Sequence, residues 1–364
     1  MGWYGHYNSK LALICLLIFF IMLYRNRKVY SGTMQQSNNY WFVFIFMALY
    51  SVLGFLEWDT YHYYGMYEST KASGYNLSFE HFFFWLIKTL PESYLLWRVA
   101  IWGTASVLMV LSAKRLNINA NVFGFMVPLL FITQLSVTRG GIGLALMVYC
   151  SILFIQSLDR KKIGLVLLAA FGIYGSVFMH RSMILFVLLL IGAMFLPLNK
   201  RTIIISVILF PFLYGSIMAL TGRISFINQS DWMIDYIERE KTEMNLNGFI
   251  MTFFRSALYI LLVFHMGRKY LYEKRETSKP LFFLYKYSYI LIYVSFLFMG
   301  QATSGWISDR TLHAASFPLV LCASNCFDNN LDNTKRITLE KVLIIGFFIS
   351  TFWKQLIFLR MYWS

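Results

Sequence analysis

The chain has 364 residues, of which 58% are hydrophobic and only 13% are charged. Soluble domains typically carry about 25% charged residues, so this composition excludes an ordinary water-soluble fold. The formal net charge of +15 raises nucleic-acid binding as a class of function. However, the basic residues fall in short clusters between apolar runs, as in the cytoplasmic loops of multi-pass membrane proteins, and no nucleic-acid partner is expected.

Long apolar runs recur along the chain. Because roughly 20 residues of helix cross the hydrocarbon core of a bilayer, the runs predict an all-α polytopic integral membrane protein with about 12 transmembrane helices. Two larger outer segments, 57–93 and 222–247, are expected within a single transmembrane domain of residues 1–364. The expected spans are residues 10–24, 40–56, 94–113, 121–137, 140–158, 163–179, 182–197, 202–221, 248–267, 287–306, 311–327 and 342–359.

The basic clusters also predict an orientation. Lys and Arg concentrate in alternate connections, including residues 25–28, 160–162 and 268–286, and the last of these contains Lys279 and Lys286. The positive-inside rule places such connections in the cytoplasm, so the N-terminus and the C-terminus are both expected outside. The four cysteines lie inside apolar runs without metal-type spacing, and no metal site or cofactor is expected.

The outer segment 57–93 carries residues suited to sugar binding. Spacings of four put Asp59, Tyr63 and Tyr67 on one face of a helix. The carboxylate can accept hydrogen bonds from sugar hydroxyls, and aromatic rings stack on sugar C–H surfaces. The alternatives are an interfacial aromatic belt for the tyrosines and a helix N-cap for Asp59. Glu92, just before the next span, is open to the same two interpretations.

Arginines recur at the outer ends of the expected spans, where the positive-inside rule does not place them. An ionisable residue at a span costs roughly 2.5–3.5 kcal/mol on insertion scales, which favours a partner or a task for it. A guanidinium stays charged and binds phosphate oxygens in a bidentate way, which suits a lipid diphosphate. Snorkelling to headgroups, or pairing with acidic residues, is the alternative. These arginines are Arg98, Arg139, Arg181, Arg223, Arg255 and Arg310.

Two of these arginines lie in very short hairpin connections. Arg139 precedes the three glycines of residues 140–143, and Arg181 follows His180. The glycines either open backbone amides at a helix N-terminus to an anion or allow close helix packing. His180 has an unperturbed pKa near 6.5, which suits either proton transfer or a neutral hydrogen bond, although a structural role is equally open.

The order of these motifs resembles the EpsG-type branch of the Wzy-like polysaccharide polymerases over most of the chain. The resemblance implies a glycosyltransferase of the bacterial inner membrane that joins undecaprenyl-diphosphate-linked oligosaccharide repeat units on its outer face. The product would be an O-antigen, an exopolysaccharide or a capsule. The motifs are Asp59-Thr60 with Tyr63, Glu92, Arg139 before the glycines, His180-Arg181-Ser182 and Asp309-Arg310.

In this hypothesis the reaction is metal-independent, because arginines stabilise the leaving diphosphate. The expected substrate-binding residues are Arg139, Arg181, Arg310, Arg98, Arg223, Tyr63 and Tyr67. The candidate catalytic residues are Asp59, Glu92 and His180, with Asp59 favoured as the base that deprotonates the acceptor hydroxyl. Besides the lipid-linked glycans and the bilayer, a flippase and a chain-length regulator of the same pathway are possible partners.

Two other functions remain as alternatives. A transporter or flippase of lipid-linked sugars would also use arginines and aromatic residues, but internal repeats and polar residues near mid-membrane are typical of that class. A membrane acyltransferase that modifies surface glycans would need a histidine within a span, for which His265 and His313 are the candidates.

Overall fold

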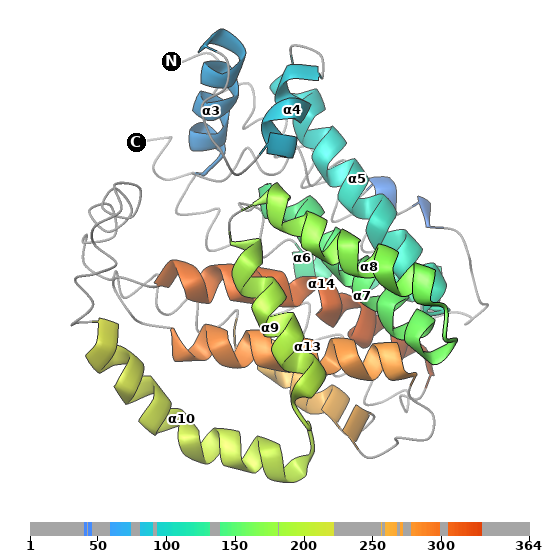
Figure 1. The fold of residues 1–364 in the computed structure, drawn as a ribbon, viewed down its shortest axis with the longest axis vertical. Helices are drawn as coiled ribbons and strands as arrows, with labels where there is room; N and C mark the ends of the chain where they lie inside the picture. Colours follow the sequence, from blue (N-terminus) through green and yellow to red (C-terminus); the bar gives the residue numbers. More distant parts are fainter. Residues whose placement is uncertain are drawn as a thin grey trace. The chain divides into compact units, whose positions relative to one another are not determined.

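The computed structural model describes residues 40–41, 43–45, 59–73, 81–89, 93–131, 139–180, 182–221, 256, 259–267, 270–271, 278–298 and 305–329. All regular structure in these residues is helical, which confirms the all-α prediction (Figure 1). Four of the helices are long and apolar enough to cross a membrane. They are α5 (Tyr94–Arg115), α7 (Arg139–Asp159), α10 (Lys200–Thr221) and α13 (Lys279–Leu297).

The other helices of the described part of the chain are shorter, except for the less apolar α14 (Gly305–Asn329). The shorter ones are α3 (Asp59–Ser73), α4 (His81–Thr89), α6 (Ala120–Phe131), α8 (Ile163–Ser176), the 3-10 helix η3 (Val177–Met179) and α9 (Met183–Phe195). The expected spans 10–24 and 342–359 and the outer segment 222–247 lie outside the described residues. The total of about 12 spans therefore stays a prediction.

The chain divides into two compact units, and each is described by itself. The first unit comprises Met1–Leu188, Ser278–Leu281 and Val320–Ser364, and the second comprises Leu189–Thr277 and Phe282–Leu319. The candidate residues of the first unit come from α3, α4, α5, α7 and the connection after η3.

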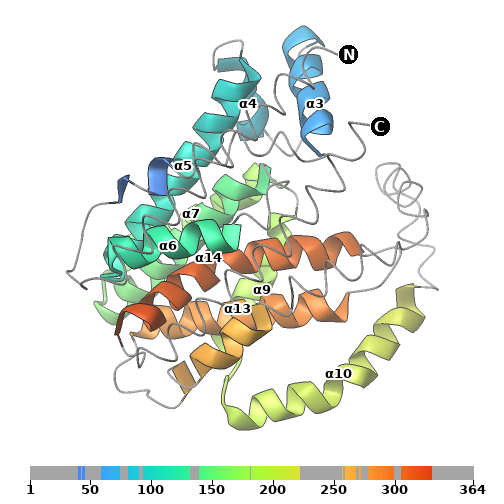
Figure 2. The same cartoon turned by 180° about the vertical axis from the view of Figure 1, so that it is seen from behind.

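In the first unit, α7 packs against both α5 and α8; Figure 1 shows the three helices together, and Figure 2 shows α5 and α7 from behind. The buried face of α5 follows helical periodicity, with Trp97, Ile101, Ala105 and Met109 each at most 1% exposed. Leu96 and Leu111 on the same helix are exposed, as expected for side chains that face lipid. Ser93 caps the start of α5, where its Oγ accepts from the backbone N–H of Leu96.

Helices α5 and α7 end in the same way. After α5, Asn117 takes a left-handed φ of 53°, and the N–H of Ile118 donates to the carbonyl of Ala113. After α7, Lys161 takes the same φ of 53°, and the N–H of Lys162 donates to the carbonyl of Ser157. Both are Schellman closures, in which glycine is the usual left-handed residue. The left-handed backbone costs a residue with a side chain roughly 1–2 kcal/mol, and asparagine tolerates it better than lysine.

The sequence predicts a span over 287–306, but α13 begins eight residues earlier, at Lys279, and ends at Leu297. Lys279 and Lys286 therefore lie in a helix and not in a loop, and the side of the membrane on which this helix begins stays a prediction. Both ammonium groups have partners that hydropathy alone does not reveal. Lys279 Nζ lies 2.6 Å from Oδ1 of Asp159, and Lys286 Nζ donates to the carbonyl of Leu196 at 3.1 Å.

In the second unit, α10 meets α13 through side chains. Tyr289 Oη lies 2.5 Å from Ser206 Oγ, and Tyr293 Oη donates to the carbonyl of Ser206 at 2.8 Å. Pro211 lies inside α10, which is visibly curved (Figure 1). None of residues 200–217 is buried, so most of this apolar helix presents a surface suited to lipid.

Candidate functional site

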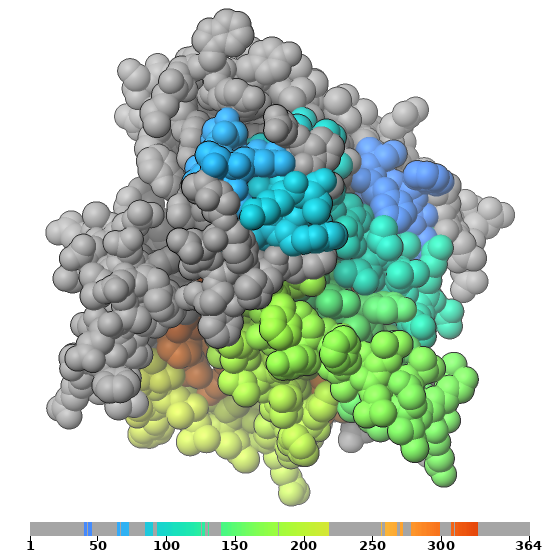
Figure 3. Space-filling model, turned by 45° about the horizontal axis from the view of Figure 1, so that its top comes forward, coloured from blue at the N-terminus to red at the C-terminus, as the bar shows by residue number. Residues whose placement is uncertain are grey.

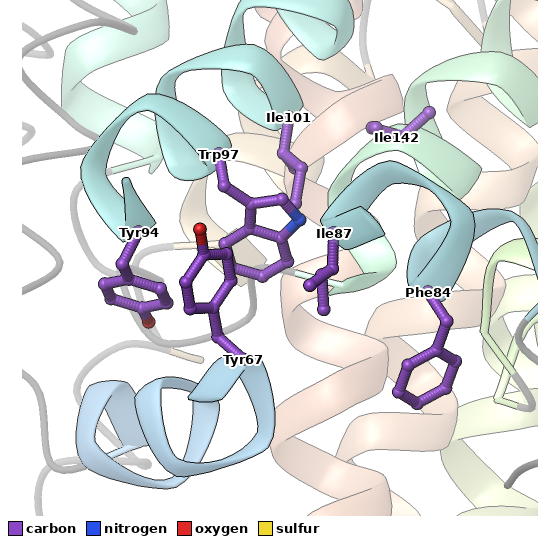
Figure 4. Packing of buried hydrophobic residues seen from close by; sticks show 7 residues of the cluster. All are labelled: Tyr67, Phe84, Ile87, Tyr94, Trp97, Ile101 and Ile142. Atoms are coloured by element: carbon purple, nitrogen blue, oxygen red, sulfur yellow. The ribbon is translucent and has the colours of Figure 1, made fainter. Parts of the chain in front are cut away.

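An aromatic cluster joins the starts of α5 and α7 to α3 and α4. The ring of Tyr94 stacks on that of Trp97 with centroids 5.5 Å apart, and Tyr67 of α3 meets Tyr94 edge-on, also at 5.5 Å. Tyr64 approaches Tyr94 in the same edge-on manner at 5.3 Å. Figure 4 shows Trp97 at the centre of this packing. The buried members are Tyr67, Phe84, Ile87, Tyr94, Trp97, Ile101 and Ile142.

Arg98 lies one turn into α5 beside this cluster and is completely buried. Its Nη1 donates to Tyr94 Oη at 3.2 Å, and its guanidinium carbon lies 5.8 Å from the centroid of the Tyr94 ring. A guanidinium remains charged when buried, so it fixes a positive charge beneath the aromatic rings. Tyr94 orients this charge through its hydroxyl and its ring face.

The glycines at the start of α7 allow close helix packing. A Cβ at Gly141 would lie 2.9 Å from Cζ3 of Trp102, one turn below Arg98 on α5. A Cβ at Gly143 would lie 3.2 Å from side-chain atoms of Met179 and Met183. The packing interpretation of these two glycines is therefore confirmed. The first turn of α7, which begins at Arg139, is held against α5 on one side and against the start of α9 on another.

His180 follows η3, has an extended backbone conformation, and is 6% exposed. Its Nδ1 accepts from the backbone N–H of Ser182 at 3.0 Å, and Ser182 Oγ lies 2.8 Å from the same nitrogen. Because Nδ1 must accept from this N–H, the hydrogen bond favours the neutral tautomer that carries its proton on Nε2. In this state His180 caps the start of α9 and presents an N–H donor at Nε2.

The described residues also place Tyr67, which the sequence predicts as a sugar-stacking residue. Its ring retains only 3% exposure because Tyr94 and Trp97 cover it. A sugar would reach this ring only after α3 moved away from α5. Tyr64, one turn earlier on α3, is half-buried and keeps part of its ring exposed.

Helix α4 lies beside α3 at the surface of this end of the unit (Figure 3). Phe84 and Ile87 face the aromatic cluster, whereas Trp85 is 55% exposed and Lys88 is also exposed. An exposed tryptophan beside a lysine, opposite a buried apolar face, is typical of a helix at the membrane interface.

Several predicted site residues are placed only by their backbone or fall outside the described part of the chain. Asp59 is the first residue of α3, Tyr63 lies one turn later, and Arg139 is the first residue of α7, but the structure does not describe their side chains. The residues that lie outside are Glu92, Arg181 and Arg223.

Arg310 lies on α14 in the second unit and is half-buried. His313, three residues further along this helix, is 1% exposed, and its ring meets Phe317 edge-on at 5.6 Å. Arg310 belongs to the second unit and the aromatic cluster to the first, and each unit is described by itself. Its role as a diphosphate ligand stays a prediction.

The tryptophans of this site were not among the residues predicted from the sequence. Trp97 and Trp102 flank Arg98 on α5, and together with Tyr94 they recur at spacings of three to five residues. Spacings of four place Tyr94, Arg98 and Trp102 on one helical face, and Trp97 precedes Arg98 directly, which was the available signal. The sequence shows His180 and Ser182 only as residues two positions apart, which does not predict their hydrogen bond.

The helices and this site define a polytopic all-α membrane protein, in which one end of the first unit combines a buried arginine, aromatic rings and a buried histidine. A model of the EpsG family matches residues 38–362, which is nearly the whole chain. The chain therefore belongs to the EpsG family, a Wzy-like family of polysaccharide polymerases, as the motifs predict. No curated protein and no solved structure matches the chain.

Proposed function

We propose that the protein polymerises lipid-diphosphate-linked oligosaccharide repeat units, with undecaprenyl diphosphate as the lipid carrier, at the outer face of the bacterial inner membrane. The observation that carries the proposal is the family match over residues 38–362. The clustering of Arg98, the start of α7 and His180 at one end of the first unit supports it, because these elements suit a diphosphate and a sugar hydroxyl.

The proposed step is a glycosyl transfer. An acceptor hydroxyl oxygen attacks the anomeric carbon of the donor glycan, and a new C–O bond forms as the bond between that carbon and the diphosphate oxygen breaks. The bonding electron pair leaves with undecaprenyl diphosphate, and the acceptor proton passes to a base of the protein. Atoms and charge balance without any other reactant.

Arginines stabilise the negative charge that develops on the diphosphate in this mechanism. Arg139 is suited to this role because it opens α7, where backbone N–H groups also favour an anion. Arg98 supplies a buried positive charge one turn into α5, held in place by Tyr94. Arg181 is assigned to the same diphosphate, and Arg223 and Arg310 stay predicted substrate-binding residues. No metal ion is required by this arrangement.

Asp59 is the favoured base for the acceptor proton, with Glu92 as the second candidate. His180 suits the complementary role of hydrogen-bond donor, because its Nδ1 is engaged by Ser182 and its proton lies on Nε2. A donor at Nε2 would hold a sugar oxygen or a diphosphate oxygen. The tyrosines Tyr63 and Tyr67 of α3 would then contact the sugar once α3 moves.

Deletion of the gene, followed by analysis of surface polysaccharide length, tests the proposal in cells. The expected result is loss of long polymer with accumulation of lipid-linked single repeats, restored by the intact gene. Arg181→Lys, at normal expression, should fail to restore polymer, because lysine lacks the planar fork. If the protein were a transporter, its deletion would leave single repeats on the inner leaflet. If it were an acyltransferase, its deletion would leave polymer length unchanged. Either result would overturn the proposal.

A further inference from the structure

The first unit has a strongly basic end, opposite the aromatic cluster, where α5 and α7 finish and α8 and α13 begin. Its six cationic side chains are all exposed, and Asp159 is the one acidic residue among them in the described part of this end. Lys279 already neutralises Asp159 through a 2.6 Å ion pair. The basic end is defined by Lys114, Arg115, Arg160, Lys161, Lys162 and Lys279.

Arg115 is held in a fixed position within this basic end. Its Nε donates to Tyr149 Oη at 3.2 Å, and its Nη1 donates to Gln156 Oε1 at 3.4 Å. Gln156 Nε2 donates back to the carbonyl of Arg115 at 3.3 Å, and the Tyr149 ring lies 5.5 Å from the guanidinium carbon. These contacts occupy one edge of the guanidinium. The other edge, at Nη2, makes no hydrogen bond to the described residues and can donate to a phosphate oxygen.

The turn after α7 brings further positive charge beside Arg115. The N–H of Arg160 donates to the carbonyl of Gln156, which continues the helical spacing and places Arg160 one turn beyond Gln156. Lys161 follows in the left-handed conformation with φ 53°. Glycine would adopt this backbone with less strain, and lysine instead adds a cation to the turn beside Arg115.

The surroundings of the basic end favour a lipid over a soluble anion. The end closes two helices that are long and apolar enough to cross a membrane. Leu111, one turn before Arg115, is 39% exposed, Leu158 is 51% exposed and Ile163 is 74% exposed. Fixed positive charge next to exposed apolar side chains matches a molecule with an anionic headgroup and acyl chains.

We infer that the basic end is a binding site for an anionic phospholipid. The phosphate accepts from the open edge of Arg115 and from the cations of the turn 160–162, and the acyl chains lie along the exposed leucines of α5 and α7. The site is separate from the proposed polymerase site, because it lies at the other end of α5 and α7.

The test uses the full chain purified in a neutral detergent. Phosphatidylglycerol, phosphatidylcholine and inorganic phosphate are titrated separately, and both the unfolding midpoint and the lipid retained in native mass spectrometry are measured. The expected result is a saturable rise of the midpoint with phosphatidylglycerol only. An equal rise with phosphatidylcholine would overturn the inference by showing that headgroup charge is irrelevant. An equal rise with inorganic phosphate would overturn it by showing a free-anion site.

Variants then locate the site. Arg115→Gln should weaken phosphatidylglycerol binding on the order of tenfold, because a charge-assisted hydrogen bond is lost. Tyr149→Phe, which keeps the ring but removes the hydroxyl that orients Arg115, should weaken it by a smaller factor. Arg201→Gln removes an exposed cation elsewhere in the chain and should have no effect. Equal weakening by Arg201→Gln and Arg115→Gln would show a diffuse attraction and overturn the site.

Lys161→Gly separates binding from folding. It removes a cation and relieves the left-handed backbone, so it should raise the unfolding midpoint in phosphatidylcholine while it weakens phosphatidylglycerol binding. These opposite signs distinguish a lipid-binding role from a structural one. Unchanged phosphatidylglycerol affinity in Lys161→Gly would contradict a role of this turn in lipid binding.

Discussion

Gly141 of α7 lies against the indole of Trp102 of α5 so closely that an added methyl group would lie 2.9 Å from the ring carbon Cζ3. The contact fixes the first turn of α7 beside the turn of α5 that carries Arg98. Gly141→Ala should therefore lower the free energy of unfolding by about 1–3 kcal/mol, the usual cost of overpacking. Thermal unfolding of the purified variant in detergent measures this loss.

Gly103→Ala is the matched control, because a Cβ at Gly103 on α5 meets no atom within 4 Å. It should be neutral or stabilising by up to about 1 kcal/mol, since alanine is the better helix former. The double variant Gly141→Ala with Trp102→Phe should recover part of the loss, because the smaller ring makes room. An unchanged midpoint for Gly141→Ala would contradict the close approach of the two helices.

The contact between His180 and Ser182 allows the structural and chemical roles of His180 to be separated. Asparagine can accept from the N–H of Ser182 and cap α9, but it lacks a donor at the position of Nε2. His180→Asn should keep the unfolding midpoint close to that of the wild type while polymer formation falls. His180→Ala should lose about 1 kcal/mol of stability as well, through loss of the cap. Normal polymer from His180→Asn would restrict this histidine to capping.

Asp59→Asn tests the proposed base. If Asp59 removes the acceptor proton, turnover should fall on the order of 10²–10⁴, because general-base catalysis contributes that range. Asparagine is equally suited to a helix N-terminus, so stability should be maintained. The assay is polymer formation by purified enzyme, with Glu92→Gln in parallel. A larger loss from Glu92→Gln beside normal turnover of Asp59→Asn would transfer the role to Glu92.

The predicted orientation can be checked with single cysteines and a membrane-impermeant thiol reagent. Ala72, at the end of α3, and Ser278, just before α13, are both exposed, so a thiol at either position is accessible from its own side. Cys150, Cys322 and Cys326 are buried and should contribute little background, and Cys15, outside the described residues, is replaced by serine in every variant. Ala72→Cys should be labelled in intact spheroplasts, and Ser278→Cys only after the membrane is opened. The reverse pattern would place the aromatic cluster in the cytoplasm.

Much of the helical architecture was predictable because hydropathy reports burial in lipid directly. The span expected over 94–113 corresponds to α5, and that over 140–158 corresponds to α7, each within two residues at either end. The prediction failed at α13, where Lys279 and Lys286 lowered the local hydropathy. Their partners, Asp159 and the carbonyl of Leu196, come from distant parts of the chain, so the sequence alone gives no sign of them.

The candidate site was predictable in its ingredients but not in its arrangement. Helical spacing correctly placed Tyr67 in a helix after Asp59, but it did not show that Trp97 and Tyr94 would bury the tyrosine ring. The sequence also did not show whether the glycines of residues 140–143 face a ligand or Trp102. Both questions depend on packing between helices that are distant in sequence. No local sequence pattern shows which helices pack together.

The most direct test of the proposed function is reconstitution of the purified chain in vesicles with synthetic undecaprenyl-diphosphate-linked repeat units. Polymer length is followed by gel electrophoresis, and released undecaprenyl diphosphate is quantified in the same samples. The account predicts a ladder of products and one undecaprenyl diphosphate released for each new glycosidic bond, without any nucleotide or other donor. Movement of the lipid-linked repeat across the vesicle membrane, with no polymer and no released diphosphate, would contradict it.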